Sequence, residues 1–239
     1  MLTSIIVSTK NRCDALKVLF ESVKKYTKDF EFIVVDDDSK DNTREWLAQH
    51  FIKRIENVKS VPVATAWNQG AEISKGEYLI FLNDDMLVTE GWLDEMKKMY
   101  KSMPLVGSLA FKVYDDEGNI QSRGHSFAGL QPYLPEEDVL EIDYSDHPFV
   151  SKKIFERIGG FTAYGQLYYE DAGFGLKLQS QGFKNYYNPK AVLIHQTIGL
   201  RTGTEEDKKK RKYNEEVVQQ QSKVSFFKVW TDYLNSRSV

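Results

Sequence analysis

The fold is decided by the segment YLIFLNDD, which occupies residues 78–85. Residues 78–82 are all apolar or aromatic, and a short apolar run of this kind in a mixed chain predicts a buried strand. The polar residues Asn83, Asp84 and Asp85 follow directly. Because ligands bind just beyond the carboxyl ends of the strands in an open α/β sheet, the segment predicts a central strand with a polar site at its end.

The adjacent carboxylates of Asp84 and Asp85 allow two interpretations. Like charges this close destabilise a fold unless a cation or hydrogen bonds compensate. Oxygen ligands suit Mg²⁺ or Mn²⁺, and such ions commonly carry a diphosphate. The other interpretation is an ordinary turn or helix cap, because Asn and Asp are frequent in both. Taken alone, the segment favours the turn, so the decision depends on the rest of the chain.

The composition is that of a folded, slightly acidic protein. The chain has 239 residues, of which 41% are hydrophobic, and its net charge is −3. This balance argues against nucleic-acid binding, which requires a basic surface. The single cysteine, Cys13, excludes an internal disulfide and a metal cluster of Cys ligands, and it fits a reducing cytoplasm. We expect no signal peptide and no transmembrane segment, since no apolar stretch approaches ~20 residues.

Strand and helix patterns alternate in the first half of the chain. Buried strands are predicted near residues 4–8, 32–35, 58–61 and 78–82, and amphipathic helices are predicted between them and after the last one. This alternation is typical of βαβ units. The predicted fold class is therefore α/β, with a mostly parallel sheet flanked by helices.

The second half is less regular. We predict a strand at residues 106–111, a turn at 115–119, an irregular excursion over the site at 121–147, helices at 152–158 and 170–181, and two late strands at 184–187 and 191–195. A charged, Gln-rich helical tail closes the chain. The predicted organisation is one domain over residues 1–203, with halves 1–105 and 106–203, followed by the tail 204–239.

Three further polar segments lie in the first half. Residues 8–12 read STKNR after the first strand and can contact a base, a ribose or a phosphate, although an ordinary βα loop looks the same. Residues 36–38 are all aspartates, and a carboxylate there can bind a pyrimidine or a ribose, or it can cap the next helix. Residues 68–70 read NQG, which also fits a polar helix face with one tolerated glycine.

The second half adds two candidates. Glu170 and Asp171 stand at a predicted helix start, where acids favour the helix dipole, and the functional interpretation is a general base aimed into the cleft. His195 ends a predicted strand. A histidine there is usually structural, but close to a diphosphate it can ligate a metal or bind phosphate.

Together these segments resemble family 2 of the inverting glycosyltransferases, which have the GT-A fold. The resemblance rests on seven motifs in the family's order across residues 4–196, and it leaves out the tail. The motifs are STKNR at 8–12, VVDDDS at 34–39, NQG at 68–70, LNDD at 82–85, GGF at 159–161, ED at 170–171, and His195. Two positions depart from the family pattern: Gly173 replaces a frequent second acid, and Asp38 replaces a usual glycine.

The resemblance implies roles for individual residues. Asp171 corresponds to the catalytic base, and Glu170 is the neighbour that contacts the acceptor or orients the loop. Asp85 corresponds to the metal-ligating acid and His195 to a late histidine that reaches the metal, Mn²⁺ or Mg²⁺, or the diphosphate. Nucleotide binding is implied for six residues: Thr9, Asn11, Arg12, Asp37, Asn68 and Asp84.

The predicted function is inverting transfer of a sugar from a UDP- or dTDP-sugar to an acceptor hydroxyl. The predicted partners are the nucleotide-diphosphate sugar and a saccharide, lipid-linked or protein acceptor, with self-association through the tail as a further option. The predicted location is cytoplasmic, free or peripheral at the inner face of the membrane. The alternatives are a sugar nucleotidyltransferase, although residues 8–12 lack the glycines of such a loop, and a non-catalytic nucleotide-sugar binding module.

Overall fold

The apolar runs of the first half form neighbouring parallel strands. The computed structural model describes residues 1–127, 138–196 and 205–236, and in the last range the side chains of 216–231. Strands β1 (Thr3–Thr9), β2 (Phe30–Asp37) and β4 (Tyr78–Asn83) are parallel, with Thr9 opposite Asp36 and Ser8 opposite Asn83. This register brings the polar carboxyl ends of all three strands to one edge of the sheet.

The sheet becomes mixed in the second half. Its strand order is β3-β2-β1-β4-β9-β6-β10-β5, with β7 added on β6 and β8 on β10. Strand β9 lies antiparallel between β4 and β6, so it joins the two halves of the molecule. The remaining strands are β3 (Lys53–Asn57), β5 (Met86–Val88), β6 (Val106–Asp115), β7 (Ile120–Ser122), β8 (Leu140–Ile142), β9 (Phe149–Ser151) and β10 (Lys184–His195).

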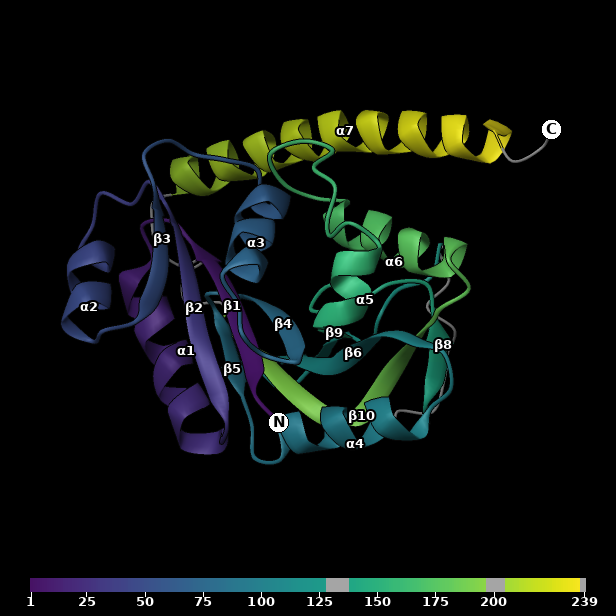
Figure 1. Cartoon of the computed structure of the whole chain (residues 1–239). Coiled ribbons are helices and arrows are strands. Elements are labelled where there is room, and N and C mark those ends of the chain that lie inside the picture. The colour runs from purple at the N-terminus through teal and green to yellow at the C-terminus, as the bar shows by residue number, and fades with distance from the viewer. Residues whose placement is uncertain (128–137, 197–204, 237–239) are drawn as a thin grey trace.

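Helices cover both faces of the sheet (Figure 1). One core cluster joins the strands to α1 and α4, and a second joins the opposite face to α3, α5 and α6. The fold class predicted from the sequence is therefore confirmed. The helices are α1 (Cys13–Tyr26), α2 (Thr43–Gln49), α3 (Val63–Glu72), α4 (Trp92–Ser102), α5 (Lys152–Arg157), α6 (Glu170–Ser180) and α7 (Glu205–Ser236).

Two predicted strand positions are wrong. The third strand is Lys53–Asn57, not 58–61, because residues 58–61 form the exposed approach to Pro62, which caps α3. The two late strands are one strand, β10, with a shift of register between Asn188 and Val192. Pro189 lies in this interruption and has no N–H to donate to the ladder of hydrogen bonds. The sequence pattern therefore suggested two strands where the structure has one.

The C-terminal helix α7 lies across the top of the molecule in Figure 1. Its Phe226 is buried against Tyr164 and Tyr169, and Ser222 Oγ donates to the Leu167 carbonyl at 2.6 Å. The helical tail is thus confirmed, and it buttresses the loop before α6. The domain boundary at 203/204 and residues 128–137 of the predicted excursion lie outside the described residues. Among the described helices, none combines the length and apolarity needed to cross a membrane.

Helix α3 packs unusually close to the sheet at Gly70. A Cβ atom added there would lie 2.4 Å from Ile6 Cγ2 and 3.4 Å from Val35 Cγ2. Alanine favours a helix over glycine by about 1 kcal/mol, but overpacking a rigid core costs about 1–3 kcal/mol. We therefore expect Gly70→Ala to lower the free energy of unfolding in urea by roughly 1–2 kcal/mol.

The matched control is Glu72→Ala, an exposed position on the same helix, where we expect a change within about 0.5 kcal/mol. If Gly70→Ala proved as stable as the parent protein, the close approach of α3 to β1 would not constrain this position.

Candidate functional site

The aligned strand ends open onto a cleft of about 910 Å³. It is lined from both halves of the chain: the loops after β1, β2 and β4, residues near 121–125 and 146–147, the start of α6 and the end of β10. All predicted site residues line this cleft except Asn11 and Asn68. The predicted residues in the lining are Thr9, Arg12, Asp37, Asp84, Asp85, Glu170, Asp171 and His195.

Arg12 connects the two adjacent acids at the end of β4. Its Nη1 lies 3.2 Å from Asp84 Oδ1, and its Nη2 lies 2.9 Å from Asp85 Oδ2. Thr9 Oγ1 donates to Asp84 Oδ2 at 2.7 Å. Burial raises the pKa of Asp84 to about 6, although the Arg12 charge and the Thr9 hydroxyl act in the opposite direction. A single guanidinium from the β1 loop thus relieves the repulsion between the two carboxylates.

Strand pairing brings His195 to the same acids. Strand β10 runs antiparallel to β5, with His195 opposite Met86, so the imidazole Nε2 lies 3.2 Å from Asp85 Oδ2. Its Nδ1 lies 2.7 Å from Gln121 Oε1. The hydrogen bond with Asp85 raises the pKa of His195, while burial opposes it. For Asp85, burial alone would raise the pKa, but His195 and Arg12 lower it overall.

The donor atoms around Asp85 fit a divalent cation held partly by a ligand. The buried Oδ1 of Asp85 has no hydrogen-bond partner among the described residues, and one carboxylate with one imidazole suits Mn²⁺ or Mg²⁺. No cluster of three or more His, Cys, Asp or Glu residues suited to a metal forms in the described part of the chain. An ion bound here would take its other ligands from phosphate oxygens and water, as Mg²⁺ commonly does.

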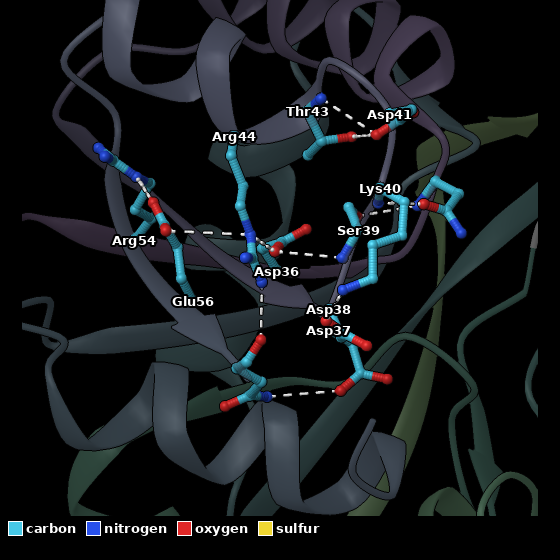
Figure 2. Close-up of polar contacts among 12 residues, drawn as sticks. Asp36, Asp37, Asp38, Ser39, Lys40, Asp41, Thr43, Arg44, Arg54 and Glu56 are labelled. Carbon is cyan, nitrogen blue, oxygen red and sulfur yellow. Dashed lines mark hydrogen bonds and ion pairs between the residues drawn. The ribbon is translucent and has the colours of Figure 1, made fainter. Parts of the chain in front are cut away.

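The three consecutive aspartates at the end of β2 have different environments (Figure 2). Asp36 is fully buried and accepts from Arg44 Nε at 2.5 Å and from the Ser39 amide at 3.3 Å, so it fastens the loop. Asp37 lines the cleft, and its carboxylate accepts from the Val61 amide at 2.8 Å. Asp38 takes a left-handed conformation, with φ 63°, and pairs with Lys40.

The conformation of Asp38 explains one departure from the family pattern. The family's usual glycine supplies a left-handed residue at little cost, and aspartate tolerates this region better than most side chains. The turn is therefore retained with Asp38 in place of glycine.

Two predicted nucleotide-binding residues, Asn11 and Asn68, do not line the cleft and form hydrogen bonds between separate segments of the chain. Asn11 Oδ1 accepts from the Lys40 amide at 2.6 Å, which ties the β1 loop to the β2 loop. Asn68 Nδ2 donates to the Phe161 carbonyl at 2.9 Å, and its Oδ1 accepts from the Phe161 amide at 3.0 Å. These bonds join α3 to the Gly-Gly-Phe segment. Direct contact of Asn11 and Asn68 with a nucleotide stays a prediction.

The acids of α6 enter the cleft from a constrained turn. Tyr168 and Tyr169, which precede the helix, have φ angles of 74° and 67°, and backbone strain of this kind is often found at functional sites. Asp171 Oδ1 accepts from the Ala172 amide at 2.7 Å. Burial raises the pKa of Asp171 to about 6. Burial and the nearby charge of Asp171 raise the pKa of Glu170 to about 8. At neutral pH, Asp171 is thus largely ionised and Glu170 largely protonated.

The sequence interpretation missed three residues that line the same cleft: His125, Asp146 and His147. His125 Nε2 lies 3.6 Å from Asp146 Oδ2, and its ring stacks on Tyr144 with centroids 4.8 Å apart. The signal was available, since the predicted excursion at 121–147 contains two of the chain's four histidines. This excursion was predicted to lie over the site, but the local pattern did not show which of its side chains reach the cleft.

Comparison with known proteins identifies the family. The profile described as Glycosyl transferase family 2 matches residues 4–171. The chain belongs to this family. The match contains every motif of the first half of the chain and ends at Asp171. The chain therefore carries a glycosyltransferase domain.

Curated relatives differ greatly in length. The O-antigen biosynthesis protein RfbC of Myxococcus xanthus is 30% identical over 224 residues, which are 80% of this chain and 17% of that protein. An uncharacterized glycosyltransferase of Haemophilus influenzae is 30% identical over 196 residues, 77% of this chain and 65% of the relative. The chain therefore spans less than a fifth of the Myxococcus protein.

Solved structures show the same fold. GalNAc-T7, crystallised with UDP, GalNAc and Mn²⁺, has a TM-score of 0.69 at 18% identity, over 82% of this chain and 44% of that one. Residues 1–349 of Staphylococcus aureus TarS give a TM-score of 0.65 at 17% identity, over 82% of this chain and 61% of that one. The GT-A fold predicted from the sequence is thereby confirmed.

The three aspartates of the β2 loop predict three separable phenotypes. Each Asp→Asn change keeps the shape and removes one charge. Asp36→Asn weakens the buried pair with Arg44, so we expect the free energy of unfolding to fall by roughly 1–3 kcal/mol. Asp37→Asn should weaken binding of a pyrimidine nucleotide diphosphate ~10- to 100-fold through loss of a charge-assisted hydrogen bond. Asp38→Asn serves as the control for the stability and the binding measurements, because asparagine also tolerates the positive φ at this position.

Urea unfolding and calorimetric titration of UDP and dTDP measure the two effects. Equal losses of nucleotide affinity in all three variants would show that the loop acts through its net charge and not through Asp37.

Proposed function

We propose that this chain transfers a sugar, with inversion, from a UDP- or dTDP-sugar to an acceptor hydroxyl, and that it depends on a divalent cation. The observation that carries the proposal is the arrangement of three acidic groups along one cleft: Asp37 at the β2 end, Asp84 and Asp85 at the β4 end, and Asp171 at the start of α6. The three groups suit, in turn, a nucleoside, a diphosphate with its cation, and an acceptor hydroxyl.

The nucleoside end is supported by the shape of the β1 and β2 loops. Asp37 is held by Ser60 and the Val61 amide and faces the cleft, where a fixed carboxylate can accept the imide N–H of a pyrimidine or a ribose hydroxyl. Thr9 and Arg12 come from the neighbouring loop. Arg12 has a planar guanidinium that binds phosphate as readily as carboxylate, so it can move from the acids to the diphosphate.

The diphosphate end is where Asp85 and His195 would hold Mn²⁺ or Mg²⁺. A bound divalent cation would stabilise the negative charge of the leaving diphosphate. Asp85 supplies a buried oxygen that has no hydrogen-bond partner in the described part of the chain, and His195 is fixed by Gln121 and Asp85. Asp84, one residue earlier, keeps Arg12 and Thr9 in place.

The acceptor end contains Asp171, which we assign as the general base. A base must be ionised at the working pH and still hold a proton well, and a pKa near 6 satisfies both requirements at neutral pH. Asp171 removes the proton from the acceptor hydroxyl as that oxygen attacks the anomeric carbon from the face opposite the diphosphate. Glu170, whose raised pKa keeps it protonated, can donate a hydrogen bond to the acceptor or the loop.

The remaining parts of the proposal concern partners and location. WfgD of Escherichia coli, named as a glucosyltransferase acting on GlcNAc-diphosphoundecaprenol, is 31% identical over 114 residues, 46% of this chain. Together with the O-antigen relative, this favours a saccharide or lipid-linked acceptor over a protein. A cytoplasmic location, peripheral at the inner membrane face, would place the enzyme beside such an acceptor. Self-association through α7 stays a prediction.

Both alternative functions make different predictions for the first experiment. A sugar nucleotidyltransferase would form a nucleotide sugar from a nucleoside triphosphate and a sugar phosphate. A binding module would bind the donor without turnover. Incubation with UDP- and dTDP-sugars, Mn²⁺ and candidate acceptors, with release of nucleotide diphosphate and the anomeric configuration of the product as readouts, separates the three. Release of nucleotide with retained configuration would contradict inversion.

The Asp171→Asn substitution tests the base. It keeps the shape and the hydrogen bond to Ala172 but removes the basicity, so we expect turnover to fall by roughly 10²–10⁴. Nucleotide affinity should change little, because in this proposal the nucleotide is bound by Asp37, by Arg12 and by the cation at Asp85. As a control for folding, the melting temperature should not fall, since the asparagine side-chain oxygen can still accept from the Ala172 amide. Near-normal turnover in this variant would remove Asp171 from the mechanism.

The pH dependence follows from the same pKa. The base works only when unprotonated, so we expect kcat/KM to fall as the pH drops below about 6, close to tenfold per pH unit. The direction is fixed by the role: a general acid in this position would lose activity as the pH rises instead. A profile that stays flat between pH 5 and 7 would contradict the assignment.

The cation dependence is tested with Asp85→Asn. We expect Mn²⁺ to strengthen UDP binding by the parent protein and to have a much smaller effect, roughly tenfold lower, in the variant. The matched control is Asp94→Asn, an exposed acid on α4 outside the cleft lining. Calorimetry of the three proteins, each with Mn²⁺ and with EDTA, measures all six affinities. An equal Mn²⁺ effect in Asp85→Asn and the parent would place the cation elsewhere.

A further inference from the structure

The wall of the cleft between the diphosphate end and the base contains two buried hydrogen-bond acceptors that lack donors. They are Asp146 Oδ1 and His147 Nδ1, and neither has a partner among the described residues. His147 is only 3% exposed, and both residues line the cleft. A buried polar atom without a partner is costly, and native proteins rarely retain one without a reason.

The position of these atoms is fixed by β9. This strand lies antiparallel between β4 and β6, so the residues that enter it are carried to the end of β4. There Asp146 and His147 line the same cleft as Asp85, His195 and Asp171. The two acceptors thus share one cavity with the metal acid and the base. In the proposed reaction this is the place of the sugar ring, because the anomeric carbon must stand between the leaving phosphate and the acceptor oxygen.

The chemistry of the two side chains makes both of them acceptors at neutral pH. Burial lowers the pKa of His147, so the ring is neutral and one nitrogen carries no proton. The ring bonds to the Phe81 carbonyl, which fixes the proton on Nε2 and leaves Nδ1 as the acceptor. Burial would raise the pKa of Asp146, but His125, His147 and Ser122 lower it strongly overall, so its carboxylate is ionised.

Several ligand classes do not match this pair. Phosphate oxygens bring no hydrogens and would be repelled by the Asp146 carboxylate. A metal ion would need more ligands, and the described residues form no such group around it. A sugar ring, in contrast, brings several hydroxyl donors on adjacent carbons.

We propose that Asp146 Oδ1 and His147 Nδ1 accept hydrogen bonds from hydroxyl groups of the sugar being transferred and so select a donor with hydroxyls at those positions. The inference rests on the proposed function and adds the residues that recognise the sugar. Selection follows because a deoxy sugar would leave the two acceptors buried and unpaired, and sites built for a hydroxyl reject the analogue that lacks it. His125 is a positioning residue here, since it holds the Asp146 carboxylate through its Nε2.

The test compares nucleotide with nucleotide sugar. Calorimetric titration with Mn²⁺ and no acceptor gives the affinities for UDP, dTDP and a panel of their hexose and N-acetylhexosamine derivatives. The best-bound derivative is then compared with its monodeoxy forms. We expect Asp146→Asn and His147→Gln to weaken binding of the best-bound nucleotide sugar ~10- to 100-fold while changing UDP or dTDP affinity less than about twofold. At least one deoxy form should lose affinity in the parent protein but not in the variants.

The substitutions are chosen to separate recognition from folding. The amide nitrogen of Gln can replace His147 Nε2 at the Phe81 carbonyl, whereas Asn in His147→Asn places an acceptor near the Nδ1 position. We therefore expect His147→Gln to remain stable and lose sugar recognition, and His147→Asn to lose stability and retain part of the recognition. Asp143→Asn is the charge control, because this acid bonds Phe127 and Gln179 and does not line the cleft.

The outcomes distinguish the two levels of the proposal. Unchanged nucleotide-sugar affinity in both Asp146→Asn and His147→Gln, with normal UDP binding, would overturn this inference and leave the proposed function standing. Equal losses for UDP and for the nucleotide sugar would overturn it as well, because the residues would then act on the nucleotide or on the fold. If the parent protein bound neither UDP nor dTDP with Mn²⁺, the proposed function itself would fail, and this inference with it.

Discussion

The guanidinium of Arg12 between the carboxylates of Asp84 and Asp85 is the interaction on which the cleft depends. Two adjacent acids at the end of a buried strand repel each other, and burial alone disfavours their charged forms. Arg12 contacts both at 3.2 and 2.9 Å, and Thr9 adds a hydrogen bond to Asp84. Because Thr9 ends β1 and Arg12 follows it, the pairing also fixes the β1 loop against the end of β4.

A second feature of the site is the accumulation of acids in a partly buried place. Asp171 and Glu170 both have raised pKa values, chiefly because burial disfavours their ionised forms. Such groups lower the stability of the folded state at neutral pH, since the unfolded chain ionises them more easily. The surrounding fold compensates with well-packed aromatic clusters, including Phe81, Phe155 and Phe161 under α3 and α6. Stability is thus concentrated in the sheet and helices, and the reactive acids are placed at their rim.

The C-terminal helix connects to this site through aromatic packing and side-chain hydrogen bonds. Phe226 and Ser222 contact the segment around residues 164–169, which leads directly into Glu170 and Asp171. The left-handed residues Tyr168 and Tyr169 lie at the end of that segment, so α7 supports the most constrained backbone of the cleft. This gives the tail a structural link to the start of α6, in agreement with its position across the top of Figure 1.

The fold class, the parallel core and eight of the ten predicted site residues in the cleft lining were predictable from the sequence, because these depend on local patterns: an apolar run, a polar strand end, a helix start. The sequence misplaced the third strand and divided β10, where an exposed approach to Pro62 and an interruption at Pro189 disturbed the periodicity. It also treated Asp36, Asp37 and Asp38 as nearly equivalent in local pattern, although one is buried, one faces the cleft and one forms the turn. These differences, and the presence of His125, Asp146 and His147 in the cleft lining, are visible only in the folded chain. The reason is physical: which side chain is buried or aimed at a ligand depends on contacts between residues far apart in the chain, such as β9 between β4 and β6, and no local period encodes that pairing.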